Sequence, residues 1–266
     1  MTDTVRSSDG TTIAFDRSGD GPPLVLVGGA LSDRSAAAGL AGHLAERFTV
    51  IAYDRRGRGD SGDTAPYAVD REVDDLLALI VDAGGSAFVF GHSSGAALAL
   101  EAAAHGLPIA RLALYEPPFI VDDSRPEVPR DYVTRLDELV SADRRGDAVE
   151  YFMTVAVGVP TDMVAQMRSS PMWASMEALA HTISYDGTVM GDATAGNPQP
   201  LQRWKSVTIP TLVMDGGASP EWQRNAVRAL VDVLPNVRHR TLEGQDHGPA
   251  DEVLAPALIE FFTAKE

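Results

Sequence analysis

The chain has 266 residues, of which 44% are hydrophobic and 23% charged, a composition typical of an enzyme-sized globular protein with a sizeable core. Its net charge of −16 is spread along the chain and disfavours a polyanionic partner such as nucleic acid. No cysteine is present, which excludes disulfides, thiolate metal sites and a cysteine nucleophile, and no apolar stretch reaches the roughly 20 residues of a membrane span. We therefore expect a cytoplasmic protein without a membrane partner.

The first third of the chain predicts strands that belong to one sheet. Residues 4–7 and 11–16 flank the turn Ser8-Asp9-Gly10 and predict an antiparallel hairpin. Continuous apolar runs at 23–27 and 48–54 are typical of buried parallel strands, and residues 70–83 predict an amphipathic helix.

A strand, a tight turn and a helix are predicted around residues 87–105. The apolar run 87–90 meets Gly91-His92-Ser93-Ser94-Gly95 and passes directly into an alanine-rich, helix-forming stretch. Such a turn holds its middle residue in a strained conformation, and it needs small neighbours because a Cβ would collide with the crossing backbone. Ser93 is therefore the candidate nucleophile, at a helix N-terminus that favours developing negative charge.

The order of the remaining elements predicts an α/β fold with a helical insertion. Strands and helices alternate up to about residue 118, and the alternation resumes with a strand predicted at 207–214, a helix at 220–234 and a last strand at 238–242. Between them the segments 131–144, 147–157, 161–168 and 171–184 all read as helices. We expect a mostly parallel sheet flanked by helices, formed by residues 1–118 and 205–266, with a helical cap inserted at 119–204.

A serine needs a base to remove its proton, and an imidazole is the usual one. His247 lies on a loop after the last predicted strand, and loops at the carboxyl ends of parallel strands share one edge of the sheet, so His247 and Ser93 can meet. His92 neighbours the serine but points elsewhere at a strained turn, so a packing or pocket-lining role is favoured. The other histidines are expected to be structural: His43, His105, His181 and His239.

At this point the sequence resembles the α/β-hydrolase superfamily over nearly its whole length. The matching segments are residues 24–29, 53–61, 91–95, 209–214 and 244–247. The resemblance implies an α/β-hydrolase fold with a cap, and an oxyanion hole formed by the backbone N–H groups of Ala30 and Ser94. It also implies that Asp54 and Arg56 tie down their loop. This chain departs from the family pattern after the first buried strand, where Gly28-Gly29 stands in place of the usual His-Gly.

The acid that orients the histidine is not at the position usual in the superfamily, where this chain has Ser219. A serine cannot stabilise an imidazolium as a carboxylate can. Two replacements are available. Asp215 lies in the same loop but nearly still on the strand, whereas Glu116 ends the strand after the nucleophile helix and precedes two prolines that would hold it in place. We favour Glu116 as the acid and keep Asp215 as the alternative. A third interpretation is that Glu116 only forms an ion pair with a nearby arginine.

This arrangement is similar to the zearalenone lactonase subgroup, in which a Glu at this strand end serves as the triad acid. That subgroup also shares the Ser-Ser-Gly-Ala turn at residues 93–96 and an Ala-Ser/Thr-Pro turn, here residues 218–220. The resemblance implies a hydrolase that needs no cofactor and cleaves an ester or lactone of an uncharged small molecule, with Ser93, His247 and Glu116 as its catalytic triad.

Several residues are predicted to line the substrate pocket, although packing between cap helices explains the cap members equally well. They are Gly29, Leu31, His92, Phe119, Phe152, Met153, Met172, Trp173 and Met176. No metal-ligand spacing or phosphate-binding glycine loop is evident, so we expect neither metal nor cofactor. Alternative functions on the same fold are a ligand-binding or natural-product-assembly protein and C–C hydrolase or perhydrolase chemistry. The sequence does not reveal the oligomeric state, and a homodimer stays open.

Overall fold

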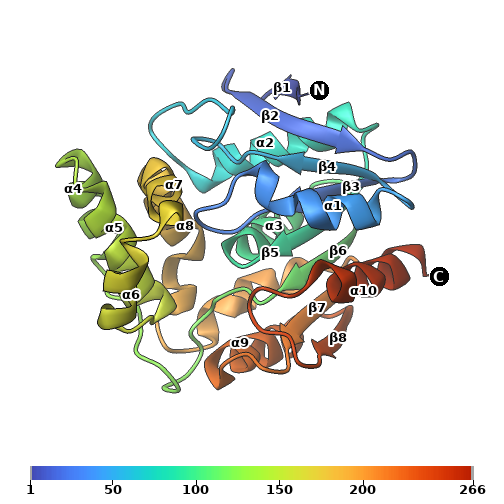
Figure 1. The fold of residues 1–266 in the computed structure, drawn as a ribbon. Coiled ribbons are helices and arrows are strands. Elements are labelled where there is room, and N and C mark those ends of the chain that lie inside the picture. The colour runs from blue at the N-terminus through green and yellow to red at the C-terminus, as the bar shows by residue number, and fades with distance from the viewer. Residues whose placement is uncertain (1, 265–266) are drawn as a thin grey trace.

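The centre of the molecule is an eight-stranded sheet, seen in a computed structural model that describes residues 2–264 (Figure 1). The strand order is β1-β2-β4-β3-β5-β6-β7-β8; β2 pairs antiparallel with both β1 and β4, and every other neighbouring pair is parallel. The strands are β1 Thr2–Arg6, β2 Thr12–Ser18, β3 Pro23–Val27, β4 Thr49–Tyr53, β5 Ala87–His92, β6 Ile109–Tyr115, β7 Thr211–Gly216 and β8 Val237–Leu242. The predicted fold class, a mostly parallel sheet with an antiparallel edge, is confirmed.

Helices cover both faces of the sheet, which explains why its central strands are apolar on both sides. On one face α1 and α10 lie in the same hydrophobic cluster as Leu24 and Leu26. On the other face α2 and α3 pack over β3, which contributes Val25 and Val27, and α9 packs over β7. These helices are α1 Ala38–Leu44, α2 Val69–Asp82, α3 Ser94–Ala104, α9 Glu221–Val231 and α10 Asp251–Thr263. Because alternate residues of a strand point to opposite faces, the mostly buried parallel strands β3 to β7 are held between two hydrophobic layers, whereas the edge strand β8 is largely exposed.

A group of helices between β6 and β7 forms a separate lobe, on the left of Figure 1. They are α4 Tyr132–Ser141, α5 Arg145–Tyr151, α6 Thr161–Met167, α7 Pro171–Leu179 and α8 Ile183–Met190, and we call this lobe the cap. The cap has its own hydrophobic cluster around Leu136, Val149, Val164 and Trp173. The alternation of strands and helices therefore stops here because the cap helices bury their apolar faces against one another instead of against the sheet.

The cap helices differ in detail from those predicted from the sequence. The predicted helix 147–157 is α5 followed by a π-helical turn, Phe152–Val157, which ends at Gly158 with a left-handed φ of 85°. The predicted helix 171–184 is α7 and a 3₁₀ turn, Ala180–Thr182, and the chain then continues as α8. Helix α8 extends to Met190 because Val189 and Met190 are buried in the main core, which is a tertiary effect that no local pattern reports.

Candidate active site

Ser93 occupies a sharp turn between the end of β5 and the start of α3. Its backbone has φ 57° and ψ −128°, a strained conformation for a residue with a side chain. A Cβ on Gly91 would lie 2.6 Å from Ala96 Cα, and one on Gly95 would fall on the carbonyl oxygen of Val27. The two glycines are therefore required for the turn, and the turn points Ser93 at the edge where the parallel strands end.

Ser93, His247 and Glu116 form a continuous chain of hydrogen bonds. His247 Nε2 lies 3.0 Å from Ser93 Oγ, and His247 Nδ1 lies 2.8 Å from Glu116 Oε2. The three residues come from loops that follow β5, β8 and β6, all at the carboxyl edge of the sheet. This is the arrangement in which an imidazole can take the serine proton while a carboxylate orients its ring.

Glu116 is held rigidly at the end of β6. Its side chain is fully buried, its backbone is left-handed with φ 44°, and its Oε1 accepts a hydrogen bond of 2.8 Å from the backbone N–H of Gly216. Burial by itself would raise the pKa of Glu116, but hydrogen bonding to His247 and to the Gly216 N–H outweighs it and lowers that pKa. Glu116 is therefore ionised at neutral pH and faces the imidazole as a carboxylate.

Asp215, the alternative acid, faces a different histidine. Its Oδ1 lies 3.1 Å from Nε2 of His239 on β8, and its side chain is buried. Ser219, at the position where the superfamily usually has its acid, is also buried. The structure thus brings Glu116, and not Asp215, to His247.

The strained residues of the chain gather at this site. Of the four non-glycine residues described with positive φ, Leu31, Ser93 and Glu116 lie in the segments that follow β3, β5 and β6, and the fourth, Asp143, lies in the cap. Strain of this kind persists only where the surrounding structure enforces it, and it concentrates at functional sites.

The two residues predicted to form the oxyanion hole, Ala30 and Ser94, lie beside Ser93. Ala30 and Ser94 line the same cavity as Ser93, and a Cβ on Gly29 would lie 2.9 Å from Ser93 Cβ. Ser94 is the first residue of α3, where an N–H has no acceptor within the helix and the helix dipole favours negative charge. The departure from the family's His-Gly to Gly28-Gly29 leaves this close approach intact, because only the second glycine has to meet Ser93.

His92 makes a hydrogen bond to the loop that carries His247. Its Nε2–H donates to the carbonyl oxygen of His247 over 2.8 Å, and the two rings lie 5.0 Å apart. Burial, together with the nearby His247, lowers the pKa of His92 to about 4. His92 is therefore neutral at neutral pH and lends its N–H to the loop that carries His247.

Gln223 is a site residue that the sequence did not predict. It lies in the first turn of α9, is buried, and places Nε2 2.8 Å from His247 Nδ1, the atom that also faces Glu116. A single Nδ1 atom cannot accept a hydrogen bond from Gln223 and donate one to Glu116 at the same time. If the Gln223 amide is turned over, its oxygen faces Nδ1, and Gln223 and Glu116 then both accept from the Nδ1–H group. A polar residue just after the Ala-Ser-Pro turn was the only signal for it in the sequence.

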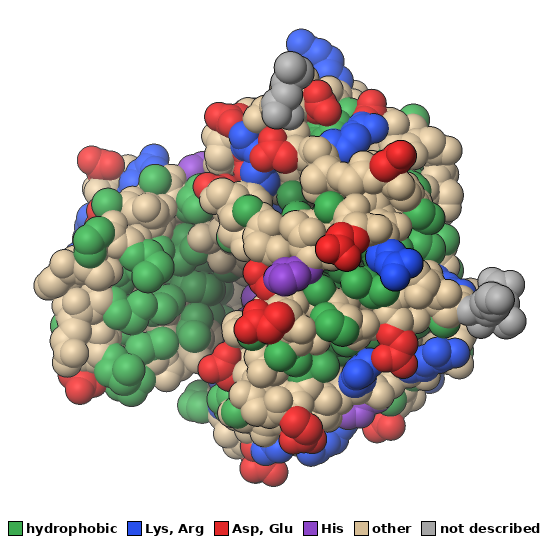
Figure 2. All heavy atoms as spheres, turned by 45° about the vertical axis from the view of Figure 1, so that its right-hand side comes forward, with side chains coloured by type: hydrophobic (Ala, Val, Ile, Leu, Met, Phe, Trp, Pro, Cys, Tyr) green, Lys and Arg blue, Asp and Glu red, His purple; other side chains and the backbone are tan. Residues whose placement is uncertain are grey.

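The site opens into a cavity of about 570 Å³ between the cap and the core. Figure 2 shows a hollow there, with hydrophobic side chains along the cap wall. Its apolar lining includes Val128, Tyr132, Phe152, Ile183 and Met190, with Trp222 on the core side. A cavity of this size accommodates a drug-sized molecule.

The structure separates the nine residues predicted for the pocket into two groups. Gly29, His92 and Phe152 line the cavity. The other six lie elsewhere: Leu31, Met153, Trp173 and Met176 pack in the cap cluster, Phe119 stacks on Trp204 in the core, and Met172 is 66% exposed. Helical spacing alone did not reveal which face of each cap helix turns towards the cavity and which towards its neighbours.

Asp54 and Arg56 have the structural use implied by the resemblance. Asp54 accepts from the backbone N–H groups of Arg34 and Asp60 over 2.7 and 2.8 Å, and Arg56 forms a buried two-pronged ion pair with Asp75. Within residues 2–264 no three or more acidic or histidine side chains are grouped to hold a metal ion. None of the helices described in that range is both long and apolar enough to cross a membrane.

Comparison with known proteins identifies the family. A sequence profile described as the alpha/beta hydrolase family matches residues 24–257, most of the chain. The chain belongs to the alpha/beta hydrolase family. The crystal structure of an alpha/beta hydrolase from Sphaerobacter thermophilus DSM 20745 is 64% identical to this hydrolase, with a TM-score of 0.92 over 98% of this chain and 100% of that one.

More distant relatives of this hydrolase include named enzymes. The 2-(acetamidomethylene)succinate hydrolase of Mesorhizobium japonicum is 26% identical over 267 residues, which cover 95% of this chain and 92% of that protein. A malate-bound thermophilic esterase from Thermogutta terrifontis is 22% identical, with a TM-score of 0.73 over 98% of each chain, and this likeness shows the shared fold alone.

Proposed function

We propose that this alpha/beta hydrolase is a cofactor-independent serine hydrolase that cleaves an ester or lactone bond of an uncharged, moderately apolar small molecule. The observation that carries the proposal is the hydrogen-bonded chain from Glu116 through His247 to Ser93, which opens into a mainly apolar cavity. The position of the acid after β6 supports a likeness to the zearalenone lactonase subgroup, which favours a lactone among the substrates to be tested.

In the proposed reaction Ser93 Oγ attacks the substrate carbonyl while His247 Nε2 takes its proton. The N–H groups of Ala30 and Ser94 stabilise the resulting oxyanion, and Glu116 stabilises the imidazolium. His247 then gives the proton to the departing alkoxide, which leaves an acyl group on Ser93; in a lactone the alcohol stays attached to that acyl group. Water, deprotonated by His247, releases the acid and restores the serine.

The charges around the cavity favour an uncharged substrate. Two arginines, Arg34 and Arg55, line it, and both are already paired with carboxylates: Arg34 with Asp16, Asp54 and Asp60, and Arg55 with Glu72 and Asp186. A dicarboxylate of the kind that the Mesorhizobium relative's name indicates would find no free cation on these arginines. A net charge of −16 disfavours an anionic substrate further.

The direct test is the variant Ser93→Ala. We expect hydrolysis of short p-nitrophenyl esters and of simple lactones to fall by roughly 10⁴-fold or more, because the nucleophile is gone. A fluorophosphonate probe should label the wild type at Ser93 and should not label the variant, as read by mass spectrometry. A wild type that is not labelled, yet binds an apolar small molecule tightly and saturably, would show that the protein is a binding module.

A further inference from the structure

A cluster of buried charges lies directly behind the nucleophile turn. Arg55, Arg58, Glu72 and Asp186 have side chains no more than 5% exposed and are joined by ion pairs of 2.6 to 2.7 Å. Taking charges out of water costs several kcal/mol per ion unless each is well paired, so such a cluster is weak evidence for stability. Because Asp186 of this cluster contacts Ser94, the residue next to Ser93, a role of the cluster in the active site has to be considered.

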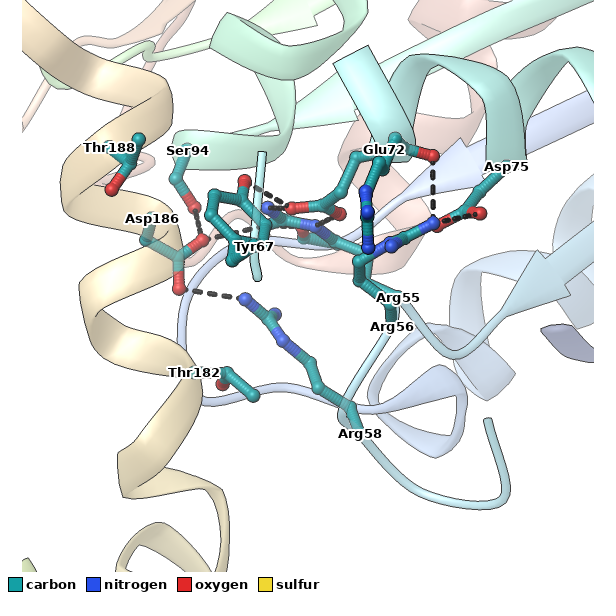
Figure 3. Close-up of polar contacts among 12 residues, drawn as sticks. Arg55, Arg56, Arg58, Tyr67, Glu72, Asp75, Ser94, Thr182, Asp186 and Thr188 are labelled. Atoms are coloured by element: carbon teal, nitrogen blue, oxygen red, sulfur yellow. Dashed lines mark hydrogen bonds and ion pairs between the residues drawn. The ribbon is translucent and has the colours of Figure 1, made fainter. Parts of the chain in front are cut away.

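Asp186 links the cap to the core in this cluster. It projects from α8, and Figure 3 shows it facing Ser94, at the start of α3, and Arg58 from the loop after β4. Its Oδ1 accepts from Ser94 Oγ over 2.7 Å and from Arg55 Nη1 over 2.6 Å, and its Oδ2 accepts from Arg58 Nη2 over 2.7 Å. Burial would raise the pKa of Asp186, but the charges of Arg58 and Arg55 outweigh it and lower that pKa, so the carboxylate stays ionised.

Arg58 connects Asp186 to the peptide group between Gly29 and Ala30, whose N–H is the first proposed oxyanion donor. Its Nη1 donates to the carbonyl oxygen of Gly29 over 2.5 Å. That carbonyl and the N–H of Ala30 belong to one planar trans peptide and point in opposite directions, so holding the oxygen fixes where the N–H points. A cation on the oxygen also polarises the peptide and strengthens the N–H as a donor.

We propose that Asp186 is a positioning residue that sets both donors of the oxyanion hole from the cap, an inference that rests on the proposed function. Through Arg58 it orients the peptide that carries the Ala30 N–H, and through the Ser94 hydroxyl it anchors the residue that supplies the second N–H. The oxyanion hole is then complete only while α8 is seated on the core, which makes the position of the cap a condition for catalysis.

The same loop offers a matched control. Asp75 is as deeply buried as Asp186 and pairs with Arg56 over 2.7 and 2.8 Å, but this pair lies on the side of the loop away from Asp186 (Figure 3). Asp75→Asn and Asp186→Asn each remove one buried carboxylate from an arginine-containing cluster, and an ion pair to another carboxylate remains in each, Arg56–Asp9 and Arg55–Glu72, so the two variants should be destabilised to a similar degree. Only Asp186→Asn removes a group that is tied to the oxyanion hole.

For Asp186→Asn we expect kcat for a p-nitrophenyl ester to fall about 10- to 100-fold with little change in KM, because misplaced donors weaken the transition state more than the bound substrate. Asp75→Asn should stay within about 3-fold of the wild type. Affinity for an aryl trifluoromethyl ketone, which forms a tetrahedral adduct with Ser93, should fall with kcat, whereas affinity for the less electrophilic methyl ketone should not.

Equal kcat and equal ketone affinities for the two variants, in a wild type that hydrolyses esters, would overturn the inference alone. A wild type that neither hydrolyses esters nor reacts with the fluorophosphonate would overturn the proposed function, and the inference with it. If Asp186→Asn does not fold, Ser94→Ala decides, since it removes one hydroxyl and no charge. A fall of roughly 5- to 20-fold in kcat and in trifluoromethyl ketone affinity supports the inference, and an unchanged value overturns it.

Discussion

Two carboxylate–imidazole pairs lie along the last strands of this sheet, and among the described residues 2–264 only one of them continues to a serine. Glu116 and His247 are 2.8 Å apart and His247 continues to Ser93, whereas Asp215 and His239 are 3.1 Å apart and neither makes a hydrogen bond to a serine. Both carboxylates are buried and both imidazoles are partly exposed. The chemistry of the two pairs is therefore similar, and their surroundings distinguish them.

The difference comes from where each histidine sits. His239 is within strand β8, where it lies beside Val213 of β7, so its side chain is confined to one face of the sheet. His247 is on the loop beyond β8, where it can turn over the edge towards the strained serine of the neighbouring turn. A carboxylate beside an imidazole becomes a candidate for catalysis only when the backbone also delivers a nucleophile to the other ring nitrogen.

The largest expected change in kcat/KM comes from Glu116→Gln, and it distinguishes the Glu116–His247 pair from the Asp215–His239 pair. Glu116→Gln replaces the carboxylate that faces Nδ1 with an amide, which cannot stabilise an imidazolium and can hold the wrong tautomer, so kcat/KM should fall by about 10³- to 10⁴-fold. Asp215→Asn should leave kcat/KM within about 3-fold of the wild type, because its partner is His239. Steady-state kinetics on a p-nitrophenyl ester measures both, and a larger loss for Asp215→Asn would assign the acid to Asp215.

A smaller effect should come from Gln223, which has no counterpart at the second pair among the contacts described for His239. Gln223→Ala removes one neutral hydrogen bond to His247 Nδ1, worth about 1 kcal/mol, so we expect a roughly 5-fold fall in kcat. Asn225→Ala on the same helix is the control, since Asn225 bonds to Asp122 and not to His247. Equal rates for the two variants would show that Glu116 orients the ring without help.

The smallest expected effect is on the free energy of unfolding, and it tests whether His92, beside His247, is neutral in the folded protein. The pKa of His92 is about 4 in the folded protein against its ordinary 6.5, so between these values the unfolded chain binds more protons than the folded one. The free energy of unfolding should therefore decrease as pH falls from 7 to 5, by about 1 to 2 kcal/mol from this group.

Urea unfolding of the wild type and of His92→Gln at both pH values measures this contribution. The variant should lose less stability on acidification than the wild type does. A His92→Gln protein that loses as much stability as the wild type would mean that His92 is protonated in the fold at pH 5.

The sequence predicted those parts of the site that depend on local chain geometry. Gly91 and Gly95 are needed within a few residues of Ser93, so the turn is visible as a motif, and an apolar run before it with a helix after it supplies the context. The serine at position 219 pointed to a displaced acid in the same way, because a missing carboxylate at a fixed spacing can be recognised without a structure. The parallel sheet followed from the alternation of apolar runs and amphipathic helices.

Packing between distant segments decided the rest. Asp186 and Gln223 meet Ser94 and His247 only after α8 and α9 are seated, and nothing in their local sequence distinguishes them from other polar residues on helices. The same is true of the pocket: Phe152 turns to the cavity while Trp173 turns into the cap, although both belong to apolar stretches of helix. Residue spacing thus predicted the fold class and the candidate nucleophile. The neighbours that each helix meets, and with them the contacts of Asp186 behind the proposed oxyanion hole, are decided by three-dimensional packing, because a helix's own periodicity does not say which neighbour it will meet.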